Sequence, residues 1–186
     1  HGRRLMPRLL LAAAAALAIT APAGAEPVWS QTHGVWTVVL DTGSYNSCQY
    51  RTRGETRNGA PVMVTFDISN LGIAMFFNVG KDAMIRGMNG AAGVAFGNTT
   101  FGGTMREGSG TKMFRTSVTS LVQTGDVDRG VAFLRSFSTA TEGAIALPDD
   151  SVFRLSLRGT LAAAKSMSTC IDMLKAMDGP SNGRRI

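Results

Sequence analysis

The sequence predicts an α+β protein, mainly an antiparallel β-sandwich or partly open barrel, with a short helix near 126–137 and a C-terminal helix near 160–177. Many short runs of β-branched and aromatic residues are separated by Gly, Asn and Asp, as in antiparallel sheets. The hydrophobic period changes from that of a strand to that of a helix only late in the chain. We therefore expect strands first and both helices in the last third.

The N-terminal residues are typical of a secretory signal peptide. Arg8 is followed by the apolar run Leu9–Ile19 and then by Ala23-Gly24-Ala25, which predicts cleavage after Ala25. The run is short for a membrane span, so an uncleaved anchor is the weaker interpretation. We expect translation to start at Met6, with residues 1–5 upstream of it.

The predicted mature chain, residues 26–186, has 161 residues, which suits one domain with a core of its own. We expect a single β-rich domain over 26–178 and a flexible polar tail over 179–186, because Gly179-Pro180 would end the last helix.

The first half of the chain reads as a series of strands joined by turns. Residues 35–40 form an apolar run, Asp41-Thr42-Gly43-Ser44 has turn chemistry, and residues 47–52 read as the returning strand. Gly54–Ala60, which contains Asn58-Gly59, predicts a second turn. Further strands are expected at 62–68 and 73–79, with a short apolar segment at 83–86.

The middle of the chain, Gly87–Gly110, is rich in glycine. The apolar segments 94–96 and 99–101 predict short strands with tight turns or bulges. A phosphate-binding loop would need a Gly-Lys-Ser/Thr order before a helix, whereas Gly110-Thr111-Lys112 has another order. Residues 113–122 predict another strand.

The short helix follows Thr124-Gly125-Asp126. Helical spacing predicts a buried face made by Val127, Val131, Leu134 and Phe137, with Asp128, Arg129 and Arg135 on the outside. Residues 144–147 and the strand from Val152 then predict a final hairpin.

A strand and a helix end the domain. Phe153, Leu155 and Leu157 alternate with Arg154, Ser156 and Arg158, which predicts a half-buried strand. Gly159 ends it, and Thr160 is expected to accept a backbone N–H as the helix N-cap. The side chains expected on the core-facing arc of the helix are Ala163, Ala164, Met167, Cys170, Ile171, Leu174 and Met177.

The chain has two cysteines, Cys48 and Cys170, separated by 122 positions. In an exported protein they can pair, and we expect a structural disulfide that fastens the C-terminal helix to the N-terminal strands. A reactive thiol or a metal site is the alternative. Both alternatives are weak, because the mature chain has one histidine, His33, and no Cys-x-x-Cys that could activate a thiol or complete a metal site.

The charge does not favour nucleic-acid binding. Without Arg3, Arg4 and Arg8 the chain has 16 basic and 13 acidic residues, a formal net charge of +3. A nucleic-acid interface would need Lys and Arg clustered on one face. The densest group, Arg51, Arg53 and Arg57, is better explained as a solvated strand edge.

One motif has catalytic precedent. Val38-Val39-Leu40-Asp41-Thr42-Gly43-Ser44 resembles the apolar-Asp-Thr-Gly-Ser motif of aspartic proteases, in which two aspartates share a proton. A single copy would require a homodimer of the retroviral type, with Asp41 as its catalytic residue. The other interpretation is an ordinary hairpin turn, for which Asp and Gly are common residues, and we favour it.

Other sites are weaker. A Ser/His/Asp triad would depend on His33, and the chain has no Gly-x-Ser-x-Gly. Asp126/Asp128 and Asp149/Asp150 lack the ligand number of a calcium loop. The methionines are scattered, as expected of core residues rather than of a copper carrier. We therefore expect no cofactor and no metal.

Both ends of the mature chain resemble small exported alphaproteobacterial proteins, among them the invasion-associated locus B family. The matching residues are Gly34-x-Trp36-Thr37-Val38, Cys48, Phe153-x-Leu155-Ser156-Leu157-x-Gly159-Thr160-x-Ala162-Ala163 and Cys170. The resemblance implies a periplasmic or surface-associated, β-rich, non-enzymatic domain and brings no catalytic residues. We accordingly expect a non-catalytic binding or cell-envelope protein in the periplasm or outside the cell. Its partner would be an envelope protein or a glycan, and its contact with the membrane would be through the cleaved signal peptide alone.

Overall fold

The computed structural model describes residues 28–43, 46–55, 59, 61–79, 89–107, 114–123 and 125–178. The predicted signal peptide, the apolar segment 83–86 and the tail 179–186 lie outside these residues. No helix in the described ranges combines the length and the apolar character that a membrane span needs.

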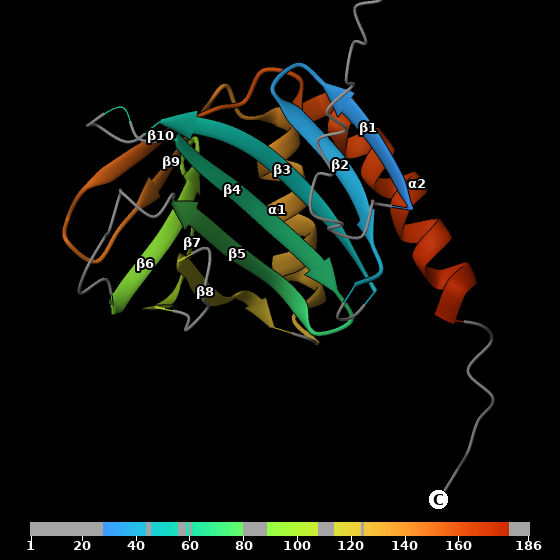
Figure 1. Ribbon diagram of the computed structural model, residues 1–186, viewed down its shortest axis with the longest axis horizontal. Coiled ribbons are helices and arrows are strands. Elements are labelled where there is room, and N and C mark those ends of the chain that lie inside the picture. Colours follow the sequence, from blue (N-terminus) through green and yellow to red (C-terminus); the bar gives the residue numbers. More distant parts are fainter. Residues whose placement is uncertain are drawn as a thin grey trace, which may run out of the picture.

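The described residues form one antiparallel sheet with the strand order β1-β2-β3-β4-β5-β8-β7-β6-β9-β10 (Figure 1). This architecture confirms the predicted class, α+β with mainly antiparallel β-structure. The strands are β1 (Trp29–His33), β2 (Trp36–Asp41), β3 (Ser47–Glu55), β4 (Pro61–Ser69), β5 (Gly72–Val79), β6 (Gly90–Phe96), β7 (Thr99–Glu107), β8 (Phe114–Gln123), β9 (Glu142–Ala146) and β10 (Val152–Ser156).

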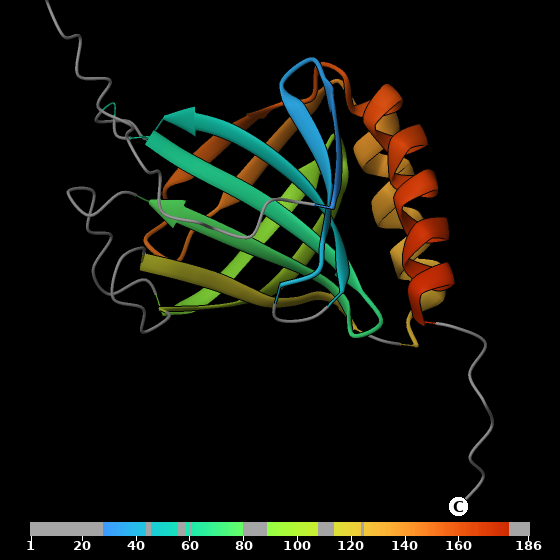
Figure 2. The same ribbon diagram turned by 45° about the vertical axis from the view of Figure 1, so that its right-hand side comes forward.

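The sheet curls over on itself, so that the later strands lie behind β3, β4 and β5 (Figure 2). Phe66 of β4 and Phe96 of β6 meet across the enclosed space, with ring centroids 5.9 Å apart. At the seam, the Phe153 ring of β10 lies against Gly54 of β3, where an added Cβ would be 2.6 Å from the ring. Among the described strands β10 pairs only with β9, so the barrel is partly open.

Two helices cover one side of the curled sheet, α1 (Val127–Thr139) and α2 (Thr160–Asp178) (Figure 2). Helix α1 buries Phe133 and Phe137 completely. The Phe137 ring is 4.8 Å from that of Trp36 and 4.5 Å from that of Tyr50. Such aromatic pairs combine large buried area with favourable ring geometry, so the two phenylalanines of α1 are central to the core.

Helix α2 packs against β1, β2, β3 and α1. Its buried apolar residues are Ala163, Met167 and Cys170, all on the predicted arc, whereas Met177 at the end of that arc is 48% exposed. The predicted disulfide is confirmed: Cys48 of β3 is bonded to Cys170, with 5.9 Å between their Cα atoms.

The predicted buried face of α1 is wrong at Val127 and Val131 but correct at Phe137, which is fully buried. Val127 and Val131, expected in the core, are 71% and 50% exposed. At about 100° per residue they lie roughly 100–140° around the helix from the stripe made by Phe133 and Phe137. The two phenylalanines have more apolar area to bury than valine, and they determine which side of the helix faces the sheet.

Two other expectations about strands were incomplete. The edge strand β1 was missed, because Trp29–His33 exposes most of its side chains and has no clear alternation.

The glycine-rich middle forms longer strands than expected: β6 and β7 pair over seven positions, from Gly90–Met105 to Phe96–Thr99. Gly93 permits this close pairing, because a Cβ there would be 2.9 Å from the carbonyl oxygen of Phe101.

Candidate functional site

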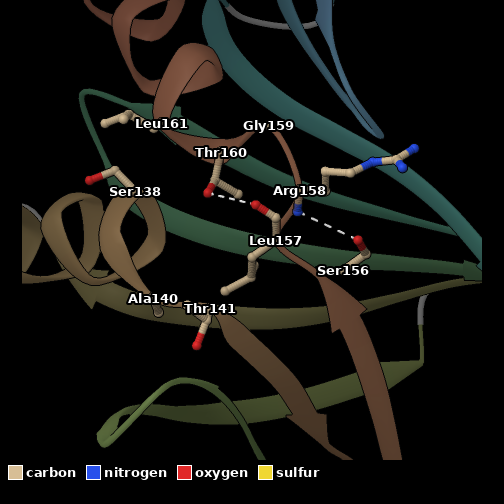
Figure 3. Close-up of a pocket in the computed structure, with 9 residues that line it drawn as sticks. All are labelled: Ser138, Ala140, Thr141, Ser156, Leu157, Arg158, Gly159, Thr160 and Leu161. Atoms are coloured by element: carbon tan, nitrogen blue, oxygen red, sulfur yellow. Dashed lines mark hydrogen bonds between the residues drawn. The ribbon is translucent and has the colours of Figure 1, made fainter.

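An open cleft of about 470 Å³ lies where the end of α1, the end of β10 and the start of α2 meet (Figure 3). Its walls are Ser138, Ala140 and Thr141 on one side and the continuous run 156–161 on the other. The hydroxyls of Ser138 and Thr141 come from the α1 side in the close-up, whereas the Arg158 guanidinium extends away from them.

Two glycines hold the wall of the cleft against the N-terminal hairpin. Gly159 has φ +96°, and a Cβ there would be 2.2 Å from the carbonyl oxygen of His33. Gly34, with φ +61°, would place a Cβ 2.5 Å from the Arg158 carbonyl oxygen. Backbone therefore packs directly on backbone, and both positions need glycine for their conformation and for space.

The first turn of α2 faces the cleft with a cap that differs from the prediction. Thr160 does not accept a backbone N–H: its hydroxyl donates to the Leu157 carbonyl oxygen at 2.9 Å. The Gly159 carbonyl accepts the first helical bond, from Ala163 N, also at 2.9 Å. The chain reversal at Gly159 thus moves the cap back by one residue, to a residue with no side chain. The N–H groups of Leu161 and Ala162 precede the first bonded amide of the helix and are available to a ligand.

The cleft offers groups that bind rather than groups that react. Ser138 donates its hydroxyl to the Arg135 carbonyl at 2.9 Å and keeps its acceptor lone pairs. The Ser156 hydroxyl accepts from Arg158 N at 3.5 Å and keeps its proton for another acceptor. A serine or threonine nucleophile would need an adjacent general base, and the described residues that line the cleft include no carboxylate, imidazole or amine.

A second, smaller hollow of about 300 Å³ lies at the opposite, N-terminal end of α1. Its lining is mostly apolar and comes from the β4–β5 turn, the end of β8 and the first two turns of α1. The residues that line it are Ile68, Ser69, Asn70, Gly72, Ile73, Val122, Gln123, Gly125, Asp126, Val127, Gly130, Val131 and Leu134.

Asp41, the residue of the aspartic-protease motif, ends β2 and lines neither the cleft nor the hollow. Its Oδ2 accepts from Arg51 at 2.7 Å, and its Oδ1 accepts from Gly43 N at 3.0 Å, as in an Asx turn. Arg51 also donates to Gln49 Oε1, at 2.8 Å from Nε. Through Gln49, which donates to the buried carboxylate of Asp67 at 2.8 Å, Asp41 belongs to a polar network across β2, β3 and β4.

His33 has a serine partner that the sequence did not reveal. His33 Nε2 lies 2.6 Å from the Ser166 hydroxyl of α2, and that hydroxyl donates to Gln31 Oε1 at 2.7 Å. Because the single hydroxyl proton goes to Gln31, Ser166 accepts from a protonated Nε2. A nucleophilic serine would need the reverse direction. These bonds join β1 to α2 and contribute to packing.

The other residues that the sequence suggested as binding or metal sites have structural partners or do not lie together. Of the arginine group, Arg51 is paired with Asp41, Arg53 is exposed and Arg57 lies outside the described residues. Asp126 caps α1 by accepting from Arg129 N at 3.2 Å. Hydrogen bonds from Ser151 lower the pKa of Asp149. Within the described ranges, no three His, Cys, Asp or Glu side chains gather as metal ligands would.

Buried inside the core, the Tyr50 hydroxyl has no hydrogen-bond partner among the residues that the structure describes. The Tyr50 side chain is fully buried beside Trp36 and Phe137. Burial raises the pKa of its phenol above the usual value. The tyrosine therefore contributes aromatic packing at the expense of one unsatisfied polar atom.

Together, the fold and the two surface depressions define a disulfide-bonded, mainly antiparallel β-domain with a polar cleft and an apolar hollow at the two ends of one helix. Compared with protein-family models, with curated proteins and with solved structures, the chain matches none of them.

Proposed function

We propose that the chain is an exported, non-catalytic binding protein of the bacterial cell envelope, and that the cleft between α1, β10 and α2 holds its ligand. The observation that carries the proposal is the composition of the cleft. Hydroxyls and unpaired helix N–H groups lie beside about 470 Å³ of open space, with the exposed Arg158 at its rim.

The chemistry of the cleft suits a polar ligand with hydroxyl groups and one anionic group, such as an acidic glycan fragment. Ser138, Thr141 and Ser156 can exchange hydrogen bonds with sugar hydroxyls. The N–H groups of Leu161 and Ala162 lie at the positive end of the α2 dipole, where an anionic group is favoured. Arg158, exposed at the rim, adds positive charge.

The alternative, a homodimeric aspartic protease, depends on Asp41. That carboxylate is paired with Arg51 and lies outside both depressions, which favours the binding function. Export rests on the predicted signal peptide, and the Cys48–Cys170 disulfide is compatible with an oxidising compartment. The family resemblance of the two ends of the chain points to the same function.

Ligand binding can be tested by following backbone amide NMR signals of the labelled mature protein. The probes are oligosaccharides with and without uronic acids. We expect the acidic set to shift Thr141, Leu161 and Ala162, and Arg158→Gln to weaken its binding several-fold. As a matched control, Arg154→Gln changes an exposed arginine of β10 that lies outside the cleft. Equal shifts with neutral sugars, or shifts remote from the cleft, would contradict the proposed ligand class.

Export has a separate test. Residues 6–25 fused to alkaline phosphatase, which is active only when exported, should give activity in bacteria. N-terminal sequencing of the protein itself should begin at Glu26. An inactive fusion would disprove export, and a retained N-terminus would disprove the cleavage site.

A further inference from the structure

Three large apolar side chains lie exposed around the hollow at the N-terminal end of α1. Leu71 is 73% exposed, Val127 71% and Val131 50%. The two valines line the hollow, and Leu71 lies in the turn between two lining residues, Asn70 and Gly72. Single exposed apolar residues are ordinary on protein surfaces, but several gathered at one hollow mark an interaction site.

Folding does not account for these side chains. The buried stripe of α1 is made by Phe133 and Phe137, and the two valines lie on another side of the helix. Valine at an exposed helical position is less favourable than the unbranched polar residues that usually occupy it. Leucine is likewise unusual in the middle of a tight turn, where Gly, Asn, Asp and Ser predominate.

A glycine in the helix keeps the hollow open. Gly130 lies in the first turns of α1 and lines the hollow, with an ordinary negative φ. A Cβ at this position would make only van der Waals contact, 3.8 Å from Val122 Cγ1. The fold therefore has room for alanine, which is the better helix former. The absence of a side chain at Gly130 leaves open space above Val122 and Ile73. These two residues are 4% and 5% exposed and form the apolar floor of the hollow.

The rim of the hollow is acidic. Asp126, the N-cap residue of α1, lines it, and Asp128 is exposed in the first turn of the helix. The nearest arginine, Arg129, is engaged elsewhere: its guanidinium lies 5.8 Å from the Phe101 ring centroid, and its Nε donates to the Leu121 carbonyl. No lysine or arginine is among the residues that line the hollow.

We propose that this hollow is a docking site for a segment of another protein that carries aliphatic side chains next to a lysine or arginine. The aliphatic groups would fill the space over Gly130, and the basic group would meet Asp126 and Asp128. A symmetric contact with a second copy would bring the acidic rims together, and an anionic lipid surface would repel them. The site goes beyond the proposed function, because it lies at the other end of α1 from the cleft.

The proposal can be tested by selecting a random peptide library, displayed on phage, against the immobilised mature protein. We expect enriched peptides to combine aliphatic residues with Lys or Arg. The strongest of them, made synthetically, should shift the amide signals of Ile73, Val122 and Gly130 and should bind more weakly at higher salt concentration. Val131→Lys should weaken it about tenfold or more, as expected from the loss of one buried aliphatic contact and an added like charge.

Gly130→Ala separates docking from folding, because it should weaken the peptide several-fold while leaving the melting temperature unchanged or higher. Asp128→Asn should reduce the salt dependence, and Asp172→Asn, an exposed acidic residue of α2, is the matched control. The proposal is overturned if the selected peptides are acidic, if none is enriched, or if they bind Val131→Lys unchanged. Dimerisation abolished by Val131→Lys would instead assign the hollow to a second copy, and binding to anionic phospholipid vesicles would assign it to a membrane; either overturns the proposal.

Discussion

Opening the Cys48–Cys170 disulfide should cost this protein about half of its stability. The bond closes a loop of 122 residues. In the loop-entropy treatment, a crosslink of that span removes about 5 kcal/mol of conformational freedom from the unfolded chain. A domain of this size is typically stable by about 5–15 kcal/mol, so the reduced protein should still fold, with a smaller margin.

The measurement is urea unfolding of the oxidised and the reduced protein, followed by far-UV circular dichroism. With a denaturant slope of about 2 kcal/mol/M, a loss of about 5 kcal/mol lowers the midpoint by roughly 2–2.5 M. The slope itself should rise on reduction, because the unfolded chain can expand further. Before unfolding, the two spectra should agree, since α2 is also held by its packing and by the Ser166–His33 hydrogen bond.

The reduced wild type retains both sulfur atoms, so its comparison with the oxidised protein isolates the crosslink. The double variant Cys48→Ala/Cys170→Ala should be less stable still, because both side chains are fully buried and their removal leaves space in the core. A midpoint shift below about 0.5 M on reduction, with both transitions two-state, would refute the entropic reasoning.

Three further predictions concern single residues. Burial raises the pKa of Tyr50, so its contribution to stability is complete below the usual phenol pKa of about 10 and is lost as the pH rises above it. Tyr50→Phe should therefore be as stable as the wild type, or up to about 2 kcal/mol more stable, at neutral pH, and should lose less stability above pH 10 in urea titrations; an unchanged alkaline decline would contradict this. Gly159→Ala should cost at least about 2 kcal/mol, from its positive φ and its contact with His33, whereas Gly102→Ala, which adds a Cβ in open space, should be nearly neutral in thermal unfolding. Asp41→Asn should cost less than about 1 kcal/mol, because its ion pair is partly exposed; a peptide-cleaving activity lost in this variant would instead support the protease alternative.

The sequence was most informative where the signal is local. Alternation in residues 62–68 and 152–158 predicts β4 and β10. In β10 the side chains that alternate with Phe153 and Leu155 are exposed, whereas in β4 Thr65 and Asp67 of the second face are buried as well. The disulfide was predictable because the chain contains only two cysteines. Composition and period therefore determined the fold class and one covalent link.

Features that depend on long-range packing could not be predicted. The helical spacing of α1 does not show whether valine or phenylalanine faces the core, so Val127 and Val131 were wrongly assigned to its buried face. The cleft joins Ser138 and Thr141 to the run 156–161, and the local sequence gives no sign of that contact. The His33–Ser166 bond spans 133 positions, which no spacing argument can detect.

The contact of the N-terminal hairpin with the β10–α2 junction has a consequence for how the protein reaches its native state. Trp36 Nε1 donates to the Ser156 carbonyl, which lies 120 positions later in the sequence, and the backbone of Gly34 packs against the Arg158 carbonyl. A chain that is synthesised from the N-terminus can form hairpins early, but β2 and β3 remain uncovered until the β10–α2 junction has been made. Such a high contact order predicts slow folding, and partly emerged chains should expose β2 and β3 to chaperones and to aggregation. The core can therefore close only after the β10–α2 junction has joined the N-terminal hairpin.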